Sequence, residues 1–326
     1  RGRDHLRQGD QAEACMSAAA TNPAALDRSG VWIAIAAYVA WGLMPLYWHL
    51  LKAVPAMQVM AHRVVWSALF VCGWLGFKYG RGWVRETLSR PHAATMLALS
   101  GALIAVNWGL YIWAVNAGHV VESSLGYFIN PLLSVVLGVV VLKERLNRVQ
   151  WLSVCIATIG VLWLTFSYGR FPWIALVLAC SFGAYGLVRK LLGVPPVRGL
   201  GVESLWLLLP ALAFLLWSEA SGQGHLLPHA DAPAWGWSVI GLLVFGGVLT
   251  SLPLIGFAAA VQRIPYSLVG LLQYISPTLQ LLVGVLVLHE PFGRERAVGF
   301  AFIWVALALY AADGLLRARR GKPAIA

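Results

Sequence analysis

Two apolar segments of the chain, 146 residues apart, each contain a proline that would disturb a helix. Pro131 and Pro277 have no backbone N–H to donate, so each leaves the carbonyl oxygen four residues earlier without its helical partner. These carbonyl oxygens belong to Tyr127 and Gln273. In an apolar environment a free carbonyl group is stable only inside protein or beside a water-filled cavity. The spacing therefore predicts two kinked helices that line a cavity.

Polar side chains share a helical face with each proline. At about 100° per residue, Tyr127 and Asn130 fall on one face of the first segment, and Gln273 and Gln280 fall on one face of the second. We expect the two faces to shape a binding site to which Tyr127, Asn130, Gln273 and Tyr274 contribute. The alternative is that these small and polar side chains only hold neighbouring helices together.

Two charged residues each lie about one turn inside an apolar segment, Arg63 in AHRVVWS and Glu203 in VESLW. Placing a charge at the centre of a bilayer costs about 2.5–3.5 kcal/mol or more, so charged residues inside membrane segments usually serve a function. We expect Arg63 to hold an anionic or polar group of a ligand, and Glu203 to pair or to titrate. The alternative is that these side chains extend back to the nearby membrane surface.

Aromatic and amide side chains deep in the apolar segments add a second kind of recognition chemistry. The faces of tryptophan and tyrosine rings stack on flat ligands and attract cations. A single ring of this kind is more often a packing residue, so the pocket is predicted from the group as a whole. The further candidate members are Trp41, Trp66, Asn107, Tyr111 and Tyr185.

The sequence lacks the motifs of several enzyme classes. It contains no GxxxxGK[ST] phosphate loop, no GxSxG nucleophile elbow and no CxxC pair. His289 and Glu290 form half of a zinc-protease motif, but Gly293 occupies the place of the second histidine. We therefore expect a protein that is not an enzyme and that uses no metal and no cofactor.

The whole composition explains what must position these residues. Of the 326 residues, 60% are hydrophobic and 11% are charged, against about 45–50% and about 25% in soluble domains. A membrane helix needs roughly 20 apolar residues, and the chain supplies ten such runs. They cover residues 30–50, 59–77, 94–115, 121–142, 149–168, 171–188, 200–218, 236–258, 266–288 and 297–315.

Lysine and arginine outnumber aspartate and glutamate by 24 to 13. In a soluble protein this excess would suggest nucleic acid, but here the basic residues lie mostly in short connections between apolar runs. If the N-terminus is cytoplasmic, the cytoplasmic segments hold 19 of these residues and the external connections hold four. This asymmetry predicts that both termini are cytoplasmic. The predicted partners are the lipid bilayer and a small-molecule substrate, not nucleic acid.

Residues 124–144 and 270–290 align without a gap and are identical at nine of 21 positions. This alignment places the fourth run over the ninth, so the repeated unit has five spans, and a five-span unit must insert upside down relative to its copy. We expect an all-α membrane protein whose ten transmembrane helices form two inverted five-helix repeats. Residues 1–15, which precede the first methionine, are either an over-extended start or a polar tail. The expected segments are a polar, disordered N-terminal tail (1–29), the two repeats (30–168 and 171–316) and a basic C-terminal tail (317–326).

Several stretches carry a family resemblance: AYVAWGLMPLYW in the first run, AHRVVWS in the second, LGYFINPL in the fourth and FGAYGLVRK in the sixth. Over residues 30–316 the chain resembles the EamA family of the drug/metabolite transporter superfamily, and within it the RarD branch of bacterial chloramphenicol-sensitivity proteins. The resemblance implies ten helices, a bacterial inner-membrane location and movement of small organic molecules, usually outward. Gln58 stands where family members tend to carry a glutamate, so the role of that carboxylate is not transferred, whereas Glu203 is kept.

These observations together predict a secondary transporter that exports small amphipathic or aromatic metabolites or drugs by alternating access. Coupling to a proton or another ion is left open, because the apolar runs hold few ionisable groups. A lipid-carrier flippase, as some members of the superfamily are, is one alternative. An intramembrane enzyme or sensor is another, and the missing nucleophile–base pair and the lack of an extramembrane domain stand against it.

Overall fold

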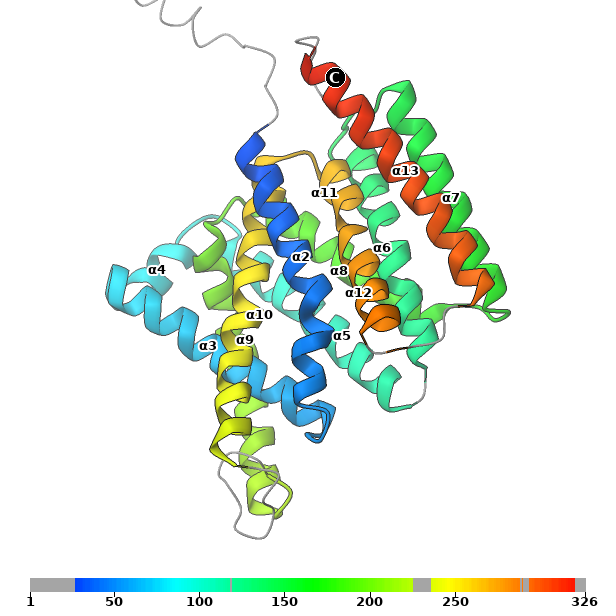
Figure 1. Cartoon of the computed structure of the whole chain (residues 1–326). Coiled ribbons are helices and arrows are strands. Elements are labelled where there is room, and N and C mark those ends of the chain that lie inside the picture. The colour runs from blue at the N-terminus through cyan, green and yellow to red at the C-terminus, as the bar shows by residue number, and fades with distance from the viewer. Residues whose placement is uncertain (1–26, 118, 225–235, 288, 290–292, 320–326) are drawn as a thin grey trace, which may run out of the picture.

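The computed structural model describes residues 27–117, 119–224, 236–287, 289 and 293–319. Within these ranges every regular element is a helix, as predicted (Figure 1). The helices are α2 (Arg28–Leu50), α3 (Ala56–Tyr79), α4 (Trp83–Leu88), α5 (Ala93–Asn116), α6 (Val120–Val140), α7 (Arg148–Ser167), α8 (Trp173–Leu192), α9 (Pro196–Ala220), α10 (Trp237–Arg263), α11 (Tyr266–Gln273), α12 (Ile275–Leu286) and α13 (Arg294–Arg319).

Ten segments are long and apolar enough to cross a membrane, and each overlaps one of the ten predicted runs. The short helix α4 lies outside them, and α11 and α12 together form the ninth. The chain is therefore a multi-pass helical membrane protein. The polar segments predicted at 1–29 and 317–326 lie mostly outside the described residues.

The two prolines act differently on their helices. The ninth span is divided at Tyr274, three residues before Pro277, into α11 and α12. Helix α6, in contrast, continues through Pro131 without a break. A proline removes one hydrogen bond from the helical ladder, and the ladder can resume on either side of it. The structure thus interrupts the ninth span close to Pro277 but does not interrupt α6 at Pro131, where the kink stays a prediction.

The helix contacts repeat between the two halves of the chain. Helix α2 contacts α10 and α12, and its counterpart five spans later, α8, contacts α5 and α6. The fourth and ninth spans meet through α6 and α11, and the fifth and tenth spans meet through α7 and α13, which lie side by side at one edge of the molecule (Figure 1). A two-fold repeat of five spans would give this pattern. The inverted orientation of the repeats remains a prediction.

Two charged side chains fix the connection between α10 and α11. The Nζ of Lys190 in α8 donates to the carbonyl oxygens of Val261 and Ile264, at 2.8 and 2.7 Å. The carboxylate of Glu144, which follows α6, accepts from the backbone N–H groups of Tyr266 and Ser267, at 2.6 and 2.9 Å. A cation at a helix C-terminus and a carboxylate at a helix N-terminus each complement the helix dipole. Both halves of the chain therefore supply groups to this end of the bundle.

Candidate binding cavity

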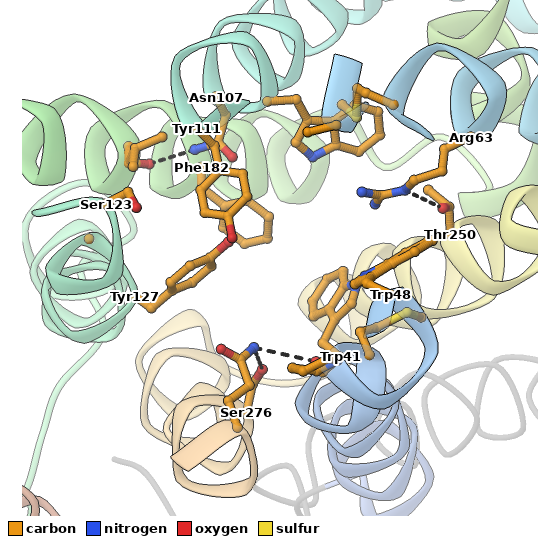
Figure 2. A pocket seen from close by; sticks show the side chains of 18 of the residues that line it. Trp41, Trp48, Arg63, Asn107, Tyr111, Ser123, Tyr127, Phe182, Thr250 and Ser276 are labelled. Atoms are coloured by element: carbon orange, nitrogen blue, oxygen red, sulfur yellow. Dashed lines mark hydrogen bonds between the residues drawn. The ribbon is translucent and has the colours of Figure 1, made fainter. Parts of the chain in front are cut away.

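A cavity of about 470 Å³ lies among helices from both halves of the chain (Figure 2). Its lining combines aromatic rings with a few polar groups, which is the usual composition of a small-molecule site. Seven of the predicted site residues lie on this lining. They are Trp41, Arg63, Asn107, Tyr111, Tyr127, Asn130 and Gln273.

Arg63 is the central charged group of the lining. Its Nε donates to Oγ1 of Thr250 at 2.9 Å, and Thr250 in turn donates to the carbonyl oxygen of Gly246 at 2.7 Å. The guanidinium carbon lies 4.6 Å from the ring centroid of Trp48 and 5.7 Å from that of Trp108. Each ring face stabilises a cation by about 0.5–2 kcal/mol. The arginine is thus held in place while most of its N–H groups remain without a hydrogen bond to a described residue.

The close crossing of α3 and α10 brings Arg63 and Thr250 together. At Gly247 a Cβ atom would stand 2.5 Å from the Cβ of Trp66 and 2.6 Å from the backbone nitrogen of Ser67. Only a residue without a side chain permits this approach. One turn away from Gly247, Ser67 and Ser251 share a hydrogen bond of 2.7 Å across the same crossing.

The opposite wall is formed by tyrosine and amide side chains from α5 and α6, together with Leu178 and Phe182 from α8. The rings of Tyr111 and Tyr127 meet edge to face with centroids 6.0 Å apart. The Nδ2 of Asn107 donates to the carbonyl oxygen of Leu178 at 2.8 Å and to Oγ of Ser181 at 3.0 Å. Asn107 is therefore oriented by protein, and the two tyrosines present their ring edges and hydroxyls to the space that Arg63 faces from the other side (Figure 2).

Two lining amides have an acceptor that is not used. Asn130 and Gln273 are 4% and 6% exposed. Their side-chain oxygens, Oδ1 and Oε1, accept no hydrogen bond from any residue that the structure describes. A buried acceptor without a donor costs about 1–3 kcal/mol. Because the two oxygens are themselves buried, a molecule in the cavity does not reach them, and the two residues meet the cavity through their other atoms.

The cavity is open at one end and closed at the other. Its lining includes two exposed residues, Lys52 in the connection between α2 and α3 and Ala56 at the start of α3. At the other end it reaches Tyr38, which is fully buried and donates to the carbonyl oxygen of Val269 at 3.1 Å. The mouth is therefore at the α2–α3 connection.

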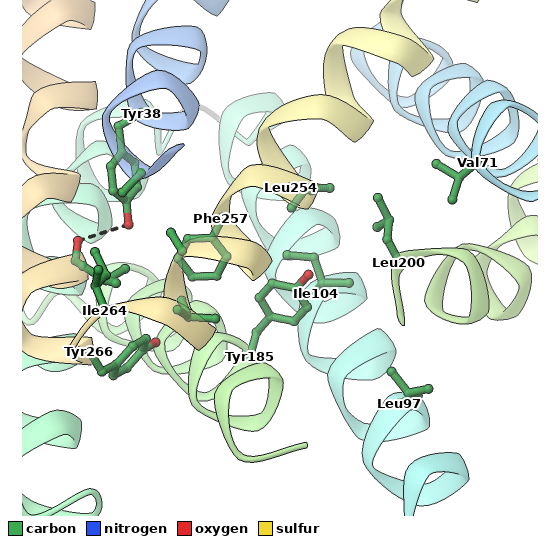
Figure 3. Packing of buried hydrophobic residues seen from close by; sticks show 14 of the residues in the cluster. Tyr38, Val71, Leu97, Ile104, Tyr185, Leu200, Leu254, Phe257, Ile264 and Tyr266 are labelled. Atoms are coloured by element: carbon green, nitrogen blue, oxygen red, sulfur yellow. Dashed lines mark hydrogen bonds between the residues drawn. The ribbon is translucent and has the colours of Figure 1, made fainter. Parts of the chain in front are cut away.

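An aromatic cluster closes the inner end (Figure 3). The ring of Phe257 stacks on that of Tyr185 at 6.1 Å and meets the edge of Tyr38 at 6.4 Å. The hydroxyl of Tyr266 donates to the carbonyl oxygen of Gly183 at 2.7 Å. Together with the Lys190 and Glu144 contacts described above, this cluster seals the bundle at the α10–α11 end.

Four predicted site residues do not line the cavity. Trp66, three residues after Arg63 in α3, donates its Nε1 to Nδ1 of His62 at 3.1 Å. Tyr185 belongs to the aromatic cluster, and Tyr274 is fully buried and donates to the carbonyl oxygen of Phe128 at 3.1 Å. The sequence predicts these rings deep in apolar runs, but depth alone does not determine which face of a helix meets the cavity.

Glu203 is the fourth of them, and it has partners that the sequence analysis missed. Its Oε1 lies 3.3 Å from Nη1 of Arg189, and the two side chains are 2% and 1% exposed. Ser100 donates to the same carboxylate, and the hydroxyl of Tyr185 lies 3.4 Å from Oε2. Arg189 directly follows the sixth predicted run, which ends at residue 188, and it is counted among the 19 basic residues of the cytoplasmic segments. The signal available was this adjacency, because a helix that continues for one more turn brings Arg189 into the bundle.

Other lining residues carried little signal in the sequence. Thr250 is a single hydroxyl residue in an apolar run, and such residues commonly bond their own helix. Trp48 lies near the end of its span, where tryptophans usually belong to the membrane interface. In the structure both contact Arg63.

Comparison with known proteins gives a consistent result. The EamA-like transporter family matches the chain twice, at residues 28–166 and 172–312. The protein RarD of Streptomyces exfoliatus is 46% identical over 296 residues, which is 90% of this chain and 92% of the relative. RarD of Escherichia coli K12 is 42% identical over 293 residues, which is 90% and 97% of the two chains. An uncharacterized transporter of Bacillus subtilis is 44% identical over 286 residues, which is 87% and 93% of the two chains. A solved structure at 19% identity shares the fold with a TM-score of 0.65 over 86% of this chain and 96% of its own.

Proposed function

Because the chain belongs to the EamA-like transporter family, we propose that it is a secondary transporter that exports small amphipathic or aromatic molecules across the bacterial inner membrane by alternating access. The relatives that carry a functional name are called transporters, which supports transport over catalysis. The substrate, the direction and the mechanism are the parts that we propose.

The observation that carries this proposal is the cavity. Residues predicted to bind substrate from both halves of the chain, among them Arg63, Asn130 and Gln273, line one space that is large enough for a small molecule. A space between two repeats near the middle of the membrane is where secondary transporters bind their substrates. Trp66, Tyr185, Glu203 and Tyr274 are left out of the proposed site, because they contact other parts of the bundle.

The charge distribution of the connections assigns a direction to the open end. If both termini are cytoplasmic, the connection between α2 and α3 is external, and the cavity mouth at Lys52 faces outward. The aromatic cluster and the contacts of Lys190 and Glu144 would then form the cytoplasmic closure. Export would require this closure to open for loading and the Lys52 end to open for release.

Comparing metabolites in cells and medium tests this proposal. Bacterial cells that overproduce the wild-type chain should release a set of small amphipathic molecules that cells with an empty vector retain. Arg63→Ala and Tyr127→Ala should reduce this release at least about tenfold, which corresponds to the loss of about 1.4 kcal/mol of binding free energy. The amount of each variant in the membrane is measured in parallel.

The two parts of the proposal fail separately. Equal release by wild-type and empty-vector cells contradicts export. Release that is normal in both variants, at equal membrane abundance, leaves the transport function in place and shows that the site has been misassigned.

A further inference from the structure

We propose that the cavity selects organic anions: flat, aromatic molecules that carry one carboxylate and no cationic group. This inference rests on the proposed function, since it names the substrate class of the same cavity. It is carried by the charge of the lining, the free edge of one arginine and the aromatic rings of the wall.

The first step is the charge of the cavity wall. Among the described residues, the lining holds two cations, Lys52 and Arg63, and no aspartate or glutamate. The described arginines that form ion pairs do so elsewhere: Arg189 with Glu203, Arg198 with Glu86 and Arg317 with Asp313. Arg63 instead contacts the ring face of Trp48 and the hydroxyl of Thr250, and no carboxylate of a described residue forms an ion pair with it. A charge removed from water without a counter-ion is unfavourable, and an anionic ligand would supply that counter-ion.

The second step is the geometry of Arg63. A guanidinium group has five N–H donors in a planar fork. Of its three nitrogens, Nε is occupied by Thr250, and this bond with the ring of Trp48 fixes the plane of the group. Neither Nη1 nor Nη2 donates a hydrogen bond to a residue that the structure describes. The two nitrogens can therefore bind both oxygens of one carboxylate, an arrangement that neutral ligands do not reproduce.

The third step is the absence of an acidic partner for a ligand cation. An ammonium group would meet Lys52 and Arg63 without any carboxylate on the described lining to compensate it. A ligand with one anion and no cation therefore fits this lining better than an amine or a zwitterion.

The fourth step is the aromatic surface of the cavity wall. The rings of Trp41, Trp108, Tyr111 and Phe182 also line the cavity. Offset and edge-to-face contacts with such rings stabilise an aromatic ligand by about 0.5–1.5 kcal/mol per pair beyond the area that is buried. The body of the ligand is thus expected to be a ring system, with its anion at Arg63.

Three probes with the same ring test the anion preference. Indole-3-acetate is an anion, indole-3-acetamide is its neutral isostere and tryptamine is a cation at pH 7. We measure the binding of each to the full-length purified protein in detergent by isothermal titration calorimetry, with thermal stabilisation as a second readout. Indole-3-acetate should bind at least about tenfold more tightly than indole-3-acetamide, and tryptamine should bind most weakly.

Variants of Arg63 connect the preference to this residue. Arg63→Gln should bring the affinities of indole-3-acetate and indole-3-acetamide within about twofold of each other, and Arg63→Lys should keep part of the difference. The control is Lys78→Gln, which removes a cation that also lies over a tryptophan ring, 5.9 Å from Trp74, but outside the cavity. Lys78→Gln should leave all three affinities unchanged.

The outcomes separate this inference from the proposed function. Equal binding of indole-3-acetate and indole-3-acetamide to the wild-type protein overturns the anion preference, whether or not the Arg63 variants fold. Stronger binding of tryptamine overturns it as well. In either case the transport proposal stands or falls on the release of metabolites from cells, which does not depend on the charge of these probes.

Discussion

Arg63, which is half-buried in the cavity wall, and Arg189, which is fully buried, have charges that are stabilised in different ways. Arg189 has a carboxylate, Glu203, and a backbone acceptor, the carbonyl oxygen of Pro196 at 2.9 Å. Arg63 has a threonine and two tryptophan faces. The first arrangement satisfies the charge inside the protein and leaves little for a ligand to add. The second leaves donors directed at an open space. We therefore assign Arg189 and Glu203 to structure and Arg63 to binding.

The first prediction follows from the burial of the Arg189–Glu203 pair. Breaking a buried ion pair leaves one charge uncompensated and typically costs about 3–5 kcal/mol, whereas replacing both partners by groups of similar volume costs much less. Glu203→Gln should therefore lower the melting temperature of the purified protein strongly. The double variant Arg189→Met with Glu203→Gln should recover most of the loss.

The control for this prediction is an exposed ion pair. Glu86 is paired with Arg198 at 2.6 Å, but its side chain is 62% exposed. Because exposed pairs contribute about 0–1 kcal/mol, Glu86→Gln should change the melting temperature little. If Glu203→Gln is as mild as Glu86→Gln, the carboxylate is not a structural ion-pair partner, and its role in transport must be reconsidered.

At the scale of helices, the position of Arg63 depends on how closely α3 and α10 approach each other. Gly247 lies at the crossing, where an added Cβ would overlap the backbone of Ser67 and the side chain of Trp66. Backbone atoms cannot relieve such an overlap by a change of rotamer, as a flexible side chain can. Any side chain at this position must push the two helices apart.

The second prediction is a pair of glycine substitutions on the same helix. Gly247→Ala should destabilise the protein by about 1–3 kcal/mol through overpacking, and it should weaken ligand binding because Arg63 moves away from Thr250. Gly241→Ala meets nothing within 4 Å, so it should be neutral or stabilise α10 by about 0.4–1 kcal/mol. Melting temperatures and calorimetric titration with indole-3-acetate measure both effects. Equal behaviour of the two variants would contradict the close crossing.

The helices could be predicted from the sequence more completely than the site. Runs of about 20 apolar residues determine where membrane helices form, and all ten were found. Several predicted cavity residues could be recognised by a charge or an amide inside an apolar run, as at Arg63, Asn130 and Gln273, whereas Trp41 and Tyr111 were predicted as aromatic rings deep in their runs. Thr250 and Trp48 carry no such feature, since each is ordinary in a membrane helix.

The sequence did not determine which of the predicted site residues contact one another. Glu203 was expected in the site, but its partner Arg189 was assigned to a connection because the predicted run ended at residue 188. Helix α8 continues to Leu192, so Arg189 lies inside the bundle. A shift of a few residues at a helix end therefore changes a surface cation into a buried one.

At the scale of the whole molecule, two independent asymmetries define a direction. The basic residues are concentrated on one side of the membrane, and the cavity opens on the other, at the connection between α2 and α3. The closed end holds the aromatic cluster, Lys190 and Glu144. An exporter in this state would be open for release of its substrate, and its binding site would be separated from the cytoplasm.

The third prediction tests this direction by cysteine labelling. The four native cysteines (Cys15, Cys72, Cys155 and Cys180) are first replaced by alanine, and Lys52→Cys and Arg85→Cys are then introduced separately. Lys52 lies at the cavity mouth, and Arg85 lies in α4, between the second and third spans. Both side chains are exposed. A maleimide that cannot cross the inner membrane should label Lys52→Cys in intact cells and Arg85→Cys only after the cells are broken.

Labelling in the reverse order would place the mouth in the cytoplasm. The same cavity would then be open for loading rather than release, and the closed end would face outward. Labelling of both positions in intact cells would mean that the chain inserts in two orientations, which contradicts the 19-to-four distribution of basic residues as the orientation signal. The charge of the connections thus makes a prediction about which conformation of the transport cycle the structure represents.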